Sequence, residues 1–153
     1  MIEVGTAAPA FTLFSSDKKQ VSLGDFAGKN VVLLFFPQAF TGVCTQELCD
    51  MRDNLSKYES LNAAVLAVSV DSVFTLGKYK AEQNYNFPML SDFNKDVSAA
   101  YGSLYSDFVF GMKGVSKRSA FVIDANGIVR YAEVLDNATE IPDFNAVRNA
   151  LIY

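Results

Sequence analysis

Histidine is absent from the 153-residue sequence, and cysteine occurs only twice, as Cys44 and Cys49. Without an imidazole there is no Ser-His or Cys-His nucleophile pair and no imidazole general base. Nearly all zinc sites other than all-thiolate ones are excluded too, and two thiols cannot complete an all-thiolate site within one chain. In a reducing compartment two cysteines this close favour redox chemistry over a structural disulfide. The two cysteines are therefore the candidates for chemistry.

Clusters of basic residues and long apolar runs are also missing. The formal net charge is −4, with 13 Lys and Arg against 17 Asp and Glu, and no basic run is longer than a pair. This balance argues against nucleic acid and against an anionic membrane as partners. No stretch reaches the roughly 18 to 20 apolar residues that span a bilayer, and the first residues lack the basic start of a secretory signal. We therefore expect a cytoplasmic protein.

Hydrophobic residues, in contrast, make up 50% of the sequence, which is enough for a full core. A chain of this length buries roughly 68 to 70% of its unfolded surface on folding and needs neither metals nor disulfides for stability. No internal repeat, low-complexity tract or Pro/Gly-rich linker divides the sequence. We expect one domain spanning residues 1–153.

Two unbroken apolar runs, at residues 31–36 and 63–70, predict strands that are covered on both faces of a sheet. Between them, Cys44, Leu48 and Met51 recur at helical spacing and predict a helix that extends to about Leu55. The order strand, helix, strand is typical of a parallel βαβ unit, which places this helix beside the two central strands.

The remaining segments complete an α/β pattern. We expect an N-terminal hairpin at residues 11–22, a helix at 76–84 and an extended piece at 87–90. A short helix at 97–101, a second hairpin with an Asn-Gly turn at 118–134 and a final helix at 142–151 follow. A parallel core with an appended antiparallel hairpin and a last helix is typical of thioredoxin-like domains. The predicted fold is therefore a central mixed β-sheet flanked by helices, with an N-terminal β-hairpin.

Cys44 lies at a special point of this pattern. The chain leaves a buried strand at Pro37, turns, and enters the helix at about Gly42 or Val43, so Cys44 falls in its first turn. Open α/β sheets bind ligands at such strand ends. The unpaired N–H groups and partial positive charge of a helix N-terminus favour a thiolate over a thiol. This position predicts a nucleophilic cysteine.

The pattern Pro37-x-x-x-Thr41-x-x-Cys44 resembles the signature of the peroxiredoxins, thiol peroxidases built on a thioredoxin-like fold. The stretch from residue 35 to residue 44 is most similar to the alkyl hydroperoxide reductase E type. The resemblance covers nearly the whole chain, because three further segments resemble the opening, the middle and a late strand of the family: residues 9–13, 87–92 and 118–124. Several motifs in the right order are far more specific than any one of them.

The resemblance implies a role for each matching residue. Cys44 would attack the terminal peroxide oxygen and become a sulfenic acid, while Thr41 would place its hydroxyl against the peroxide and Pro37 would shield the sulfur. Arg118 would bring a permanent positive charge to the thiolate and the transition state. Glu47 matches an acidic position that the family often holds near its arginine. No metal, haem or flavin is implied.

Cys49 departs from the E type, which generally lacks a second cysteine there, and instead matches the resolving cysteine of the bacterioferritin-comigratory or Q type. In an intact helix, residues i and i+5 are roughly 8.7 Å apart at Cα. Disulfides need less than about 7 Å. We hypothesise that Cys44 and Cys49 pair only after the helix unwinds and that a reductant reopens the bond. Cys49 could instead face the core, and Cys44 would then be recycled by an external thiol.

The implied substrates are hydrogen peroxide and organic hydroperoxides, and the implied reductant is a thioredoxin-like protein or a low-molecular-weight thiol. We also expect a homodimer, because E-type enzymes commonly dimerise through the side of the fold with an aromatic cluster, here Tyr101, Tyr105, Phe108, Phe110 and Met112. Those residues could also form a substrate wall. Two rival functions remain at this point: a thiol-disulfide oxidoreductase, which ordinarily uses Cys-x-x-Cys, and a redox sensor.

Simpler interpretations exist for two of the site residues. Thr41 could be only a helix N-cap, since threonine is a preferred residue at that position. Arg118 follows Lys117 and could belong to a solvated basic patch. Arg130 belongs to the second hairpin and could also approach the pocket.

Overall fold

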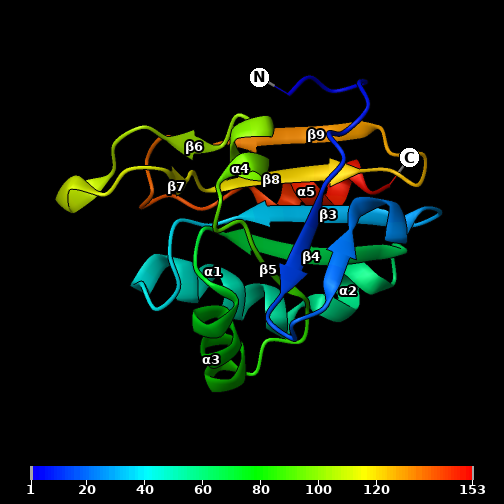
Figure 1. Cartoon of the computed structure of the whole chain (residues 1–153). Coiled ribbons are helices and arrows are strands. Elements are labelled where there is room, and N and C mark those ends of the chain that lie inside the picture. Colours follow the sequence, from blue (N-terminus) through cyan, green and yellow to red (C-terminus); the bar gives the residue numbers. More distant parts are fainter. Residues whose placement is uncertain (1, 153) are drawn as a thin grey trace.

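The computed structural model describes residues 2–152, which form a seven-stranded mixed sheet and a separate two-stranded one (Figure 1). The larger sheet contains β1 (Thr12–Ser15), β2 (Gln20–Ser22), β3 (Asn30–Phe35), β4 (Ala63–Ser69), β5 (Met89–Ser91), β8 (Ser119–Ile123) and β9 (Val129–Val134). Their order is β2-β1-β5-β4-β3-β8-β9, with β3, β4 and β5 parallel and the other neighbours antiparallel. The predicted mixed sheet is confirmed.

Helices and 3₁₀ turns connect these strands: η1 (Leu23–Phe26), α1 (Gly42–Asp53), α2 (Leu55–Glu59), α3 (Val73–Gln83), α4 (Asp96–Ala100), η2 (Val109–Gly111) and α5 (Phe144–Ala150). The small sheet pairs β6 (Leu104–Tyr105) with β7 (Val115–Ser116). We call residues 104–116 the arm, because β6, η2 and β7 extend away from the main sheet (Figure 1).

The central strand β3 explains why the helices settle on both faces of the sheet. All six of its residues are buried, and successive side chains point to opposite faces. Val32 and Leu34 pack in a core with residues of α1, α2, α3 and α5, whereas Leu33 and Phe35 pack in a second core with residues of α4 and β1's preceding segment. An uninterrupted apolar run is what such a doubly covered strand requires.

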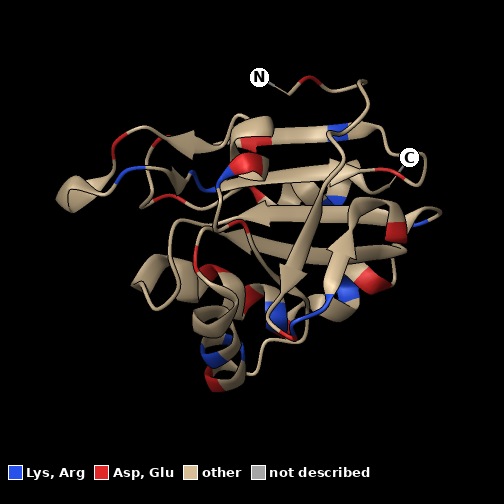
Figure 2. Cartoon of the chain, in the orientation of Figure 1, with Lys and Arg blue, Asp and Glu red and all other residues tan. Residues whose placement is uncertain are grey.

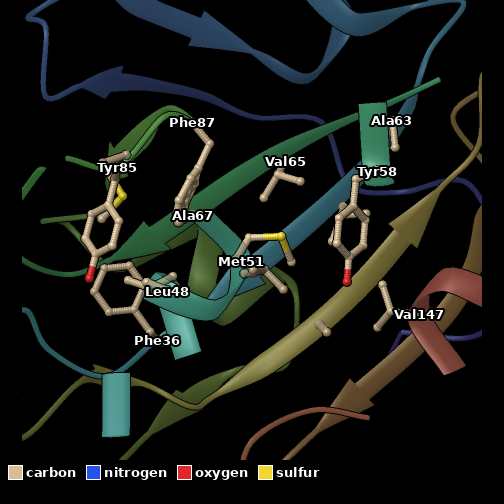
Figure 3. Close-up of a cluster of buried hydrophobic side chains, with 14 of the residues drawn as sticks. Phe36, Leu48, Met51, Tyr58, Ala63, Val65, Ala67, Tyr85, Phe87 and Val147 are labelled. Carbon is tan, nitrogen blue, oxygen red and sulfur yellow. The ribbon is translucent and has the colours of Figure 1, made fainter. Parts of the chain in front are cut away.

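The first of these cores extends beneath α1. Figure 3 shows Phe36 and Tyr85 at one end of the cluster and Tyr58 and Val147 at the other, with Leu48 and Met51 of α1 between them. Leu48 is completely buried. This apolar face holds α1 against the sheet and so fixes the position of its first turn.

The sequence prediction was wrong in detail at three places. The helix expected to reach Leu55 ends at Asp53, because Asn54 leaves the helical conformation and donates from Nδ2 to the Asp50 carbonyl; α2 then begins separately. No strand or helix was predicted for the arm, but it contains β6, η2 and β7. Tyr101 was expected to belong to one aromatic cluster with Tyr105, Phe108, Phe110 and Met112, but it is fully buried in the second core.

Charged residues of both signs are scattered over the chain, and α3 and the arm each carry both (Figure 2). Within residues 2–152, no helix combines the length and the apolar character that crossing a membrane demands.

Candidate active site

The loop between β3 and α1 places Cys44 in the first helical turn, as the sequence predicted. Phe40 adopts a positive φ of 66°, which turns the chain sharply before the helix. The backbone N–H of Ala39 donates to Oδ2 of Asp71 at 2.8 Å, and the Ser69 hydroxyl donates to the same oxygen at 2.7 Å. Asp71 thus fixes this loop from the end of β4. No motif in the sequence marks this aspartate.

Strand pairing brings Arg118 to Cys44. Phe35, near the end of β3, pairs with Ser119 at the start of antiparallel β8, so Arg118 and the loop that leads into α1 meet at one edge of the sheet. The Arg118 Nη2 atom donates to the Cys44 Sγ atom at 3.1 Å. Only 1% of each residue is exposed, and the low local dielectric strengthens the attraction between guanidinium and thiolate. A solvated basic patch at Arg118 is therefore wrong.

Two further groups anchor the Arg118 guanidinium. Nη1 donates to Oε1 of Glu47 at 2.7 Å, in an ion pair with no solvent exposure at the carboxylate. Nη2 and Nε donate to the backbone carbonyl of Ala138, at 3.0 and 3.3 Å. Ala138 lies between β9 and α5, and no side-chain pattern announces a carbonyl acceptor, so the sequence could not reveal it. The side chain is held in one orientation by charge-assisted hydrogen bonds.

Glu47 lies three residues after Cys44, on the same face of α1. Its Oε2 atom has no hydrogen-bond partner among the described residues. Burial raises the pKa of Glu47 to about 7, and the nearby Arg118 opposes that rise. Its carboxyl group is consequently neutral in part of the molecules near pH 7, which leaves more of the guanidinium charge for the Cys44 sulfur.

A pocket of about 590 Å³ opens in front of the sulfur and is lined by Pro37, Thr41, Cys44 and Arg118, with residues of the arm on its far side. The Thr41 hydroxyl donates to the Gln38 carbonyl at 2.9 Å, and it makes no capping hydrogen bond to α1. Thr41 occupies the N-cap position, but the N-cap alternative does not account for its hydroxyl. The donated hydrogen leaves the oxygen lone pairs free to accept a hydrogen bond in the pocket.

Cys49 is not part of this pocket. Its thiol is partly buried and contacts Oε1 of Gln83 at 3.6 Å and the Tyr85 hydroxyl at 3.9 Å, and both cysteines are free thiols. Arg130 also lies elsewhere, in an ion pair with Asp124 at 2.6 Å. Of the residues that the sequence predicted for the site, Cys44, Thr41, Pro37, Arg118 and Glu47 therefore come together, and Cys49 does not.

A thioredoxin-like fold with a buried cysteine at a helix N-terminus, held by an arginine beside an open pocket, defines a thiol-based redox protein. The chain belongs to the AhpC/TSA family, whose model matches residues 4–132. It is thus a peroxiredoxin, a thiol-dependent peroxidase. Hydroperoxides are its general substrate class, and a thioredoxin-type thiol is its general reductant.

Relatives and solved structures agree with the sequence resemblance. Alkyl hydroperoxide reductase E of Mycobacterium tuberculosis (strain ATCC 25618 / H37Rv) is 42% identical over 138 residues, which cover 88% of this chain and 86% of the relative. The crystal structure of peroxidoxin BcpB from Mycobacterium tuberculosis matches with a TM-score of 0.87 and 25% identity, over 99% of this chain and 97% of that one. Peroxiredoxin Q of Xanthomonas campestris matches with a TM-score of 0.81 and 28% identity, over 92% and 89%. The expected family and fold are confirmed.

Proposed function

We propose that Cys44 is the residue that reduces hydroperoxides. Its thiolate attacks the terminal oxygen of ROOH, the O–O bond breaks, and the leaving alkoxide takes up a proton as ROH. The sulfur loses two electrons and becomes a sulfenic acid, Cys44–SOH. The observation that carries this proposal is the 3.1 Å contact between Arg118 Nη2 and Cys44 Sγ at a helix N-terminus.

Arg118 acts on the thiolate and on the charge that develops during O–O cleavage. Its guanidinium is always charged, and its anchors on Glu47 and Ala138 hold it in place before the substrate arrives. A preorganised donor of this kind needs no rearrangement in the transition state. Glu47 is a positioning residue in this scheme, since it touches the arginine and not the sulfur.

Thr41 and Pro37 complete the binding site for the peroxide. Because the Thr41 hydrogen is directed to the Gln38 carbonyl, its oxygen accepts a hydrogen bond from the O–H of the hydroperoxide. Pro37 is buried beside the pocket and has no N–H group, so it keeps water from one side of the sulfur. Together they favour a bound ROOH over water.

Cys49 resolves the oxidised enzyme in this proposal. After α1 opens locally, the Cys49 thiolate attacks the sulfenic sulfur, the S–O bond breaks with release of hydroxide, and a Cys44–Cys49 disulfide forms. Hydroxide takes up a proton and leaves as water. A thioredoxin-like dithiol, or a low-molecular-weight thiol, then supplies two electrons and reopens the bond.

We further propose that residues 1–153 act as a single domain and form a homodimer in the cytoplasm. The two cores support one domain, since both contain residues of β3. The arm supports a dimer contact, because Phe110 at its tip is 96% exposed. Free thiols and a thiol reductant fit a reducing compartment.

Mass analysis after one equivalent of peroxide tests this function. Without reducing agents, the wild-type chain is expected to lose two hydrogens, whereas Cys49→Ser stops as the sulfenic acid and Cys44→Ser does not react at the same rate. Stopped-flow mixing with peroxide measures that rate. A Cys44→Ser protein that consumes peroxide as fast as the wild type would contradict the proposal, and so would a wild-type chain that yields only an intermolecular disulfide.

A further inference from the structure

One face of α1 contacts α3 and the loop between α3 and β5 through polar side chains. Thr45, Cys49 and Arg52 occupy positions i, i+4 and i+7, which form a single stripe along a helix. This stripe lies against the end of α3 and the loop that leads to β5. We call this contact zone the α1 seam, and it comprises Thr45, Cys49, Arg52, Tyr79, Gln83, Tyr85 and Asn86.

Each residue of the stripe has a polar partner across the seam. The Thr45 and Tyr79 hydroxyl oxygens lie 2.9 Å apart, within hydrogen-bond distance. Cys49 contacts Gln83 and the Tyr85 hydroxyl, as described above. Arg52, the last residue of the stripe, takes part in two hydrogen bonds across the seam. Arg52 Nη1 donates to the Gln83 carbonyl at 2.5 Å, and Asn86 Nδ2 donates to the Arg52 carbonyl at 3.2 Å.

The two tyrosines make the seam rigid near Cys49. Tyr79 and Tyr85 are both buried, and their rings meet edge to face with centroids 5.1 Å apart. Burial raises the pKa of Tyr85 well above its usual range, and the neighbouring Tyr79 hydroxyl adds to this rise. The Tyr85 hydroxyl therefore keeps its proton and can donate to the Cys49 sulfur.

The seam and the reactive sulfur lie on different sides of α1. A helix turns about 100° per residue, so five residues separate Cys44 and Cys49 by about 140° around the axis. The two cysteines pack against the same core but have different polar partners: Cys44 Sγ accepts from Arg118 Nη2, whereas Cys49 Sγ contacts Gln83 and the Tyr85 hydroxyl. Disulfide formation therefore requires Cys49 to leave its partners in the seam, and breaking those contacts is part of the barrier.

We propose that Tyr85 is a positioning residue that retains Cys49 in the seam and so sets the lifetime of the Cys44 sulfenic acid. Tyr79 and Gln83 support it in this function. The inference rests on the proposed role of Cys49 in resolution. A longer lifetime of the sulfenic acid makes Cys44 more sensitive to excess peroxide. A second ROOH can oxidise the waiting sulfenic acid to sulfinic acid, with ROH as the other product, before the disulfide forms.

The experiment follows both products after rapid mixing with peroxide, by acid quench and intact mass. Tyr85→Phe and Tyr79→Phe each remove one hydroxyl from the seam and keep the ring. Tyr101→Phe is the matched control, because Tyr101 is also fully buried and its hydroxyl donates to the Pro9 carbonyl in the other core. Thermal unfolding of all three variants shows whether they lose similar stability.

We expect Tyr85→Phe to form the disulfide about threefold to tenfold faster than the wild type, the range that loss of one hydrogen bond gives. The first oxidation of Cys44 should keep its wild-type rate, and more peroxide should be needed to reach the sulfinic acid. Tyr79→Phe should change in the same direction, and Tyr101→Phe should leave the disulfide step unchanged. A merely structural role would affect Tyr101→Phe as much as Tyr85→Phe.

An unchanged or slower disulfide step in Tyr85→Phe overturns the inference. This failure is distinct from failure of the proposed function. If the wild-type chain forms no Cys44–Cys49 disulfide at all, the role of Cys49 is wrong and the seam cannot act through it. If the wild-type chain forms the disulfide and Tyr85→Phe forms it equally fast, Cys49 resolves the enzyme but Tyr85 does not control the step.

Discussion

Arg118 Nη2 and Cys44 Sγ, 74 positions apart in the sequence, lie 3.1 Å apart in the structure. The same guanidinium donates to the Glu47 carboxylate and to the Ala138 carbonyl. One buried cation thus faces a thiolate and a carboxyl group at once. Because the pKa of Glu47 is raised to about 7, the carboxyl group competes only partly for that charge at neutral pH.

Replacement of Arg118 by Lys should slow peroxide reduction strongly. Lysine keeps the positive charge but cannot donate to Cys44, Glu47 and Ala138 from one planar group. Loss of one preorganised donor lowers a rate by about 100-fold to 1000-fold. Stopped-flow mixing with peroxide measures the second-order rate constant. Arg130→Lys serves as control, because Arg130 pairs with Asp124 outside the pocket, and equal rates for the two variants would remove Arg118 from the mechanism.

Replacement of Thr41 by Val should separate binding of the peroxide from helix capping. Valine has nearly the same shape and lacks the oxygen that accepts from the substrate, so we expect the rate constant to fall about threefold to tenfold. Thr41→Ser retains the hydroxyl and should stay close to the wild type. Urea unfolding should differ little among the three proteins, because the Thr41 side chain caps no N–H group. A Thr41→Val protein with normal rate but reduced stability would restore the N-cap interpretation.

Stability should depend on pH through Glu47. In the folded protein the pKa of Glu47 is about 7, above the ordinary value of 4.5, so the folded state binds this proton more tightly than the unfolded state. The stability that Glu47 contributes in this way is fully present below pH 4.5 and is lost as the pH rises through about 7. Glu47→Gln removes this titration and keeps an oxygen that accepts from Arg118.

Between pH 5.5 and 8, the free energy of unfolding of the protein that retains Glu47 should fall by about 2 kcal/mol more than that of Glu47→Gln. Both proteins should carry Cys44→Ser, so that oxidation of the thiol does not add to the difference. Urea denaturation at several pH values measures the difference. A difference that stays constant with pH, or that grows in favour of Glu47 as pH rises, contradicts the raised pKa.

The proposed dimer can be tested at the tip of the arm. Phe110 is 96% exposed and has a positive φ of 58°, an unusual conformation for a residue with a side chain. Light scattering should give about twice the chain mass of 16.7 kDa for the wild type. Phe110→Glu should shift the mass toward the monomer, whereas Ile152→Glu, at another exposed apolar position, should not. A wild-type monomer at micromolar concentration would end the proposal.

The apolar pattern of the sequence predicted the main elements well because each signal is local. Residues 31–35 lie in the buried strand β3, and Leu48 and Met51 line the inner face of α1, as their spacing indicated. The arm was harder to predict. Its β-pairing joins residues 104–105 to residues 115–116 across a loop, and short strands of two residues leave no periodicity to recognise.

The sequence by itself determined the family, the order of the main strands and helices, and the position of Cys44 at the start of α1, because each is read from short motifs or from residues a few places apart. Tertiary structure alone decided the environment of both sulfurs. The register of β3 against β8 set Arg118 beside Cys44, and the loop after β9 supplied the Ala138 carbonyl. The contacts of α1 with Gln83 and Tyr85 placed Cys49 in a partly buried position. These contacts join distant segments, and several use backbone atoms that every residue possesses, so no local pattern of side chains can encode them.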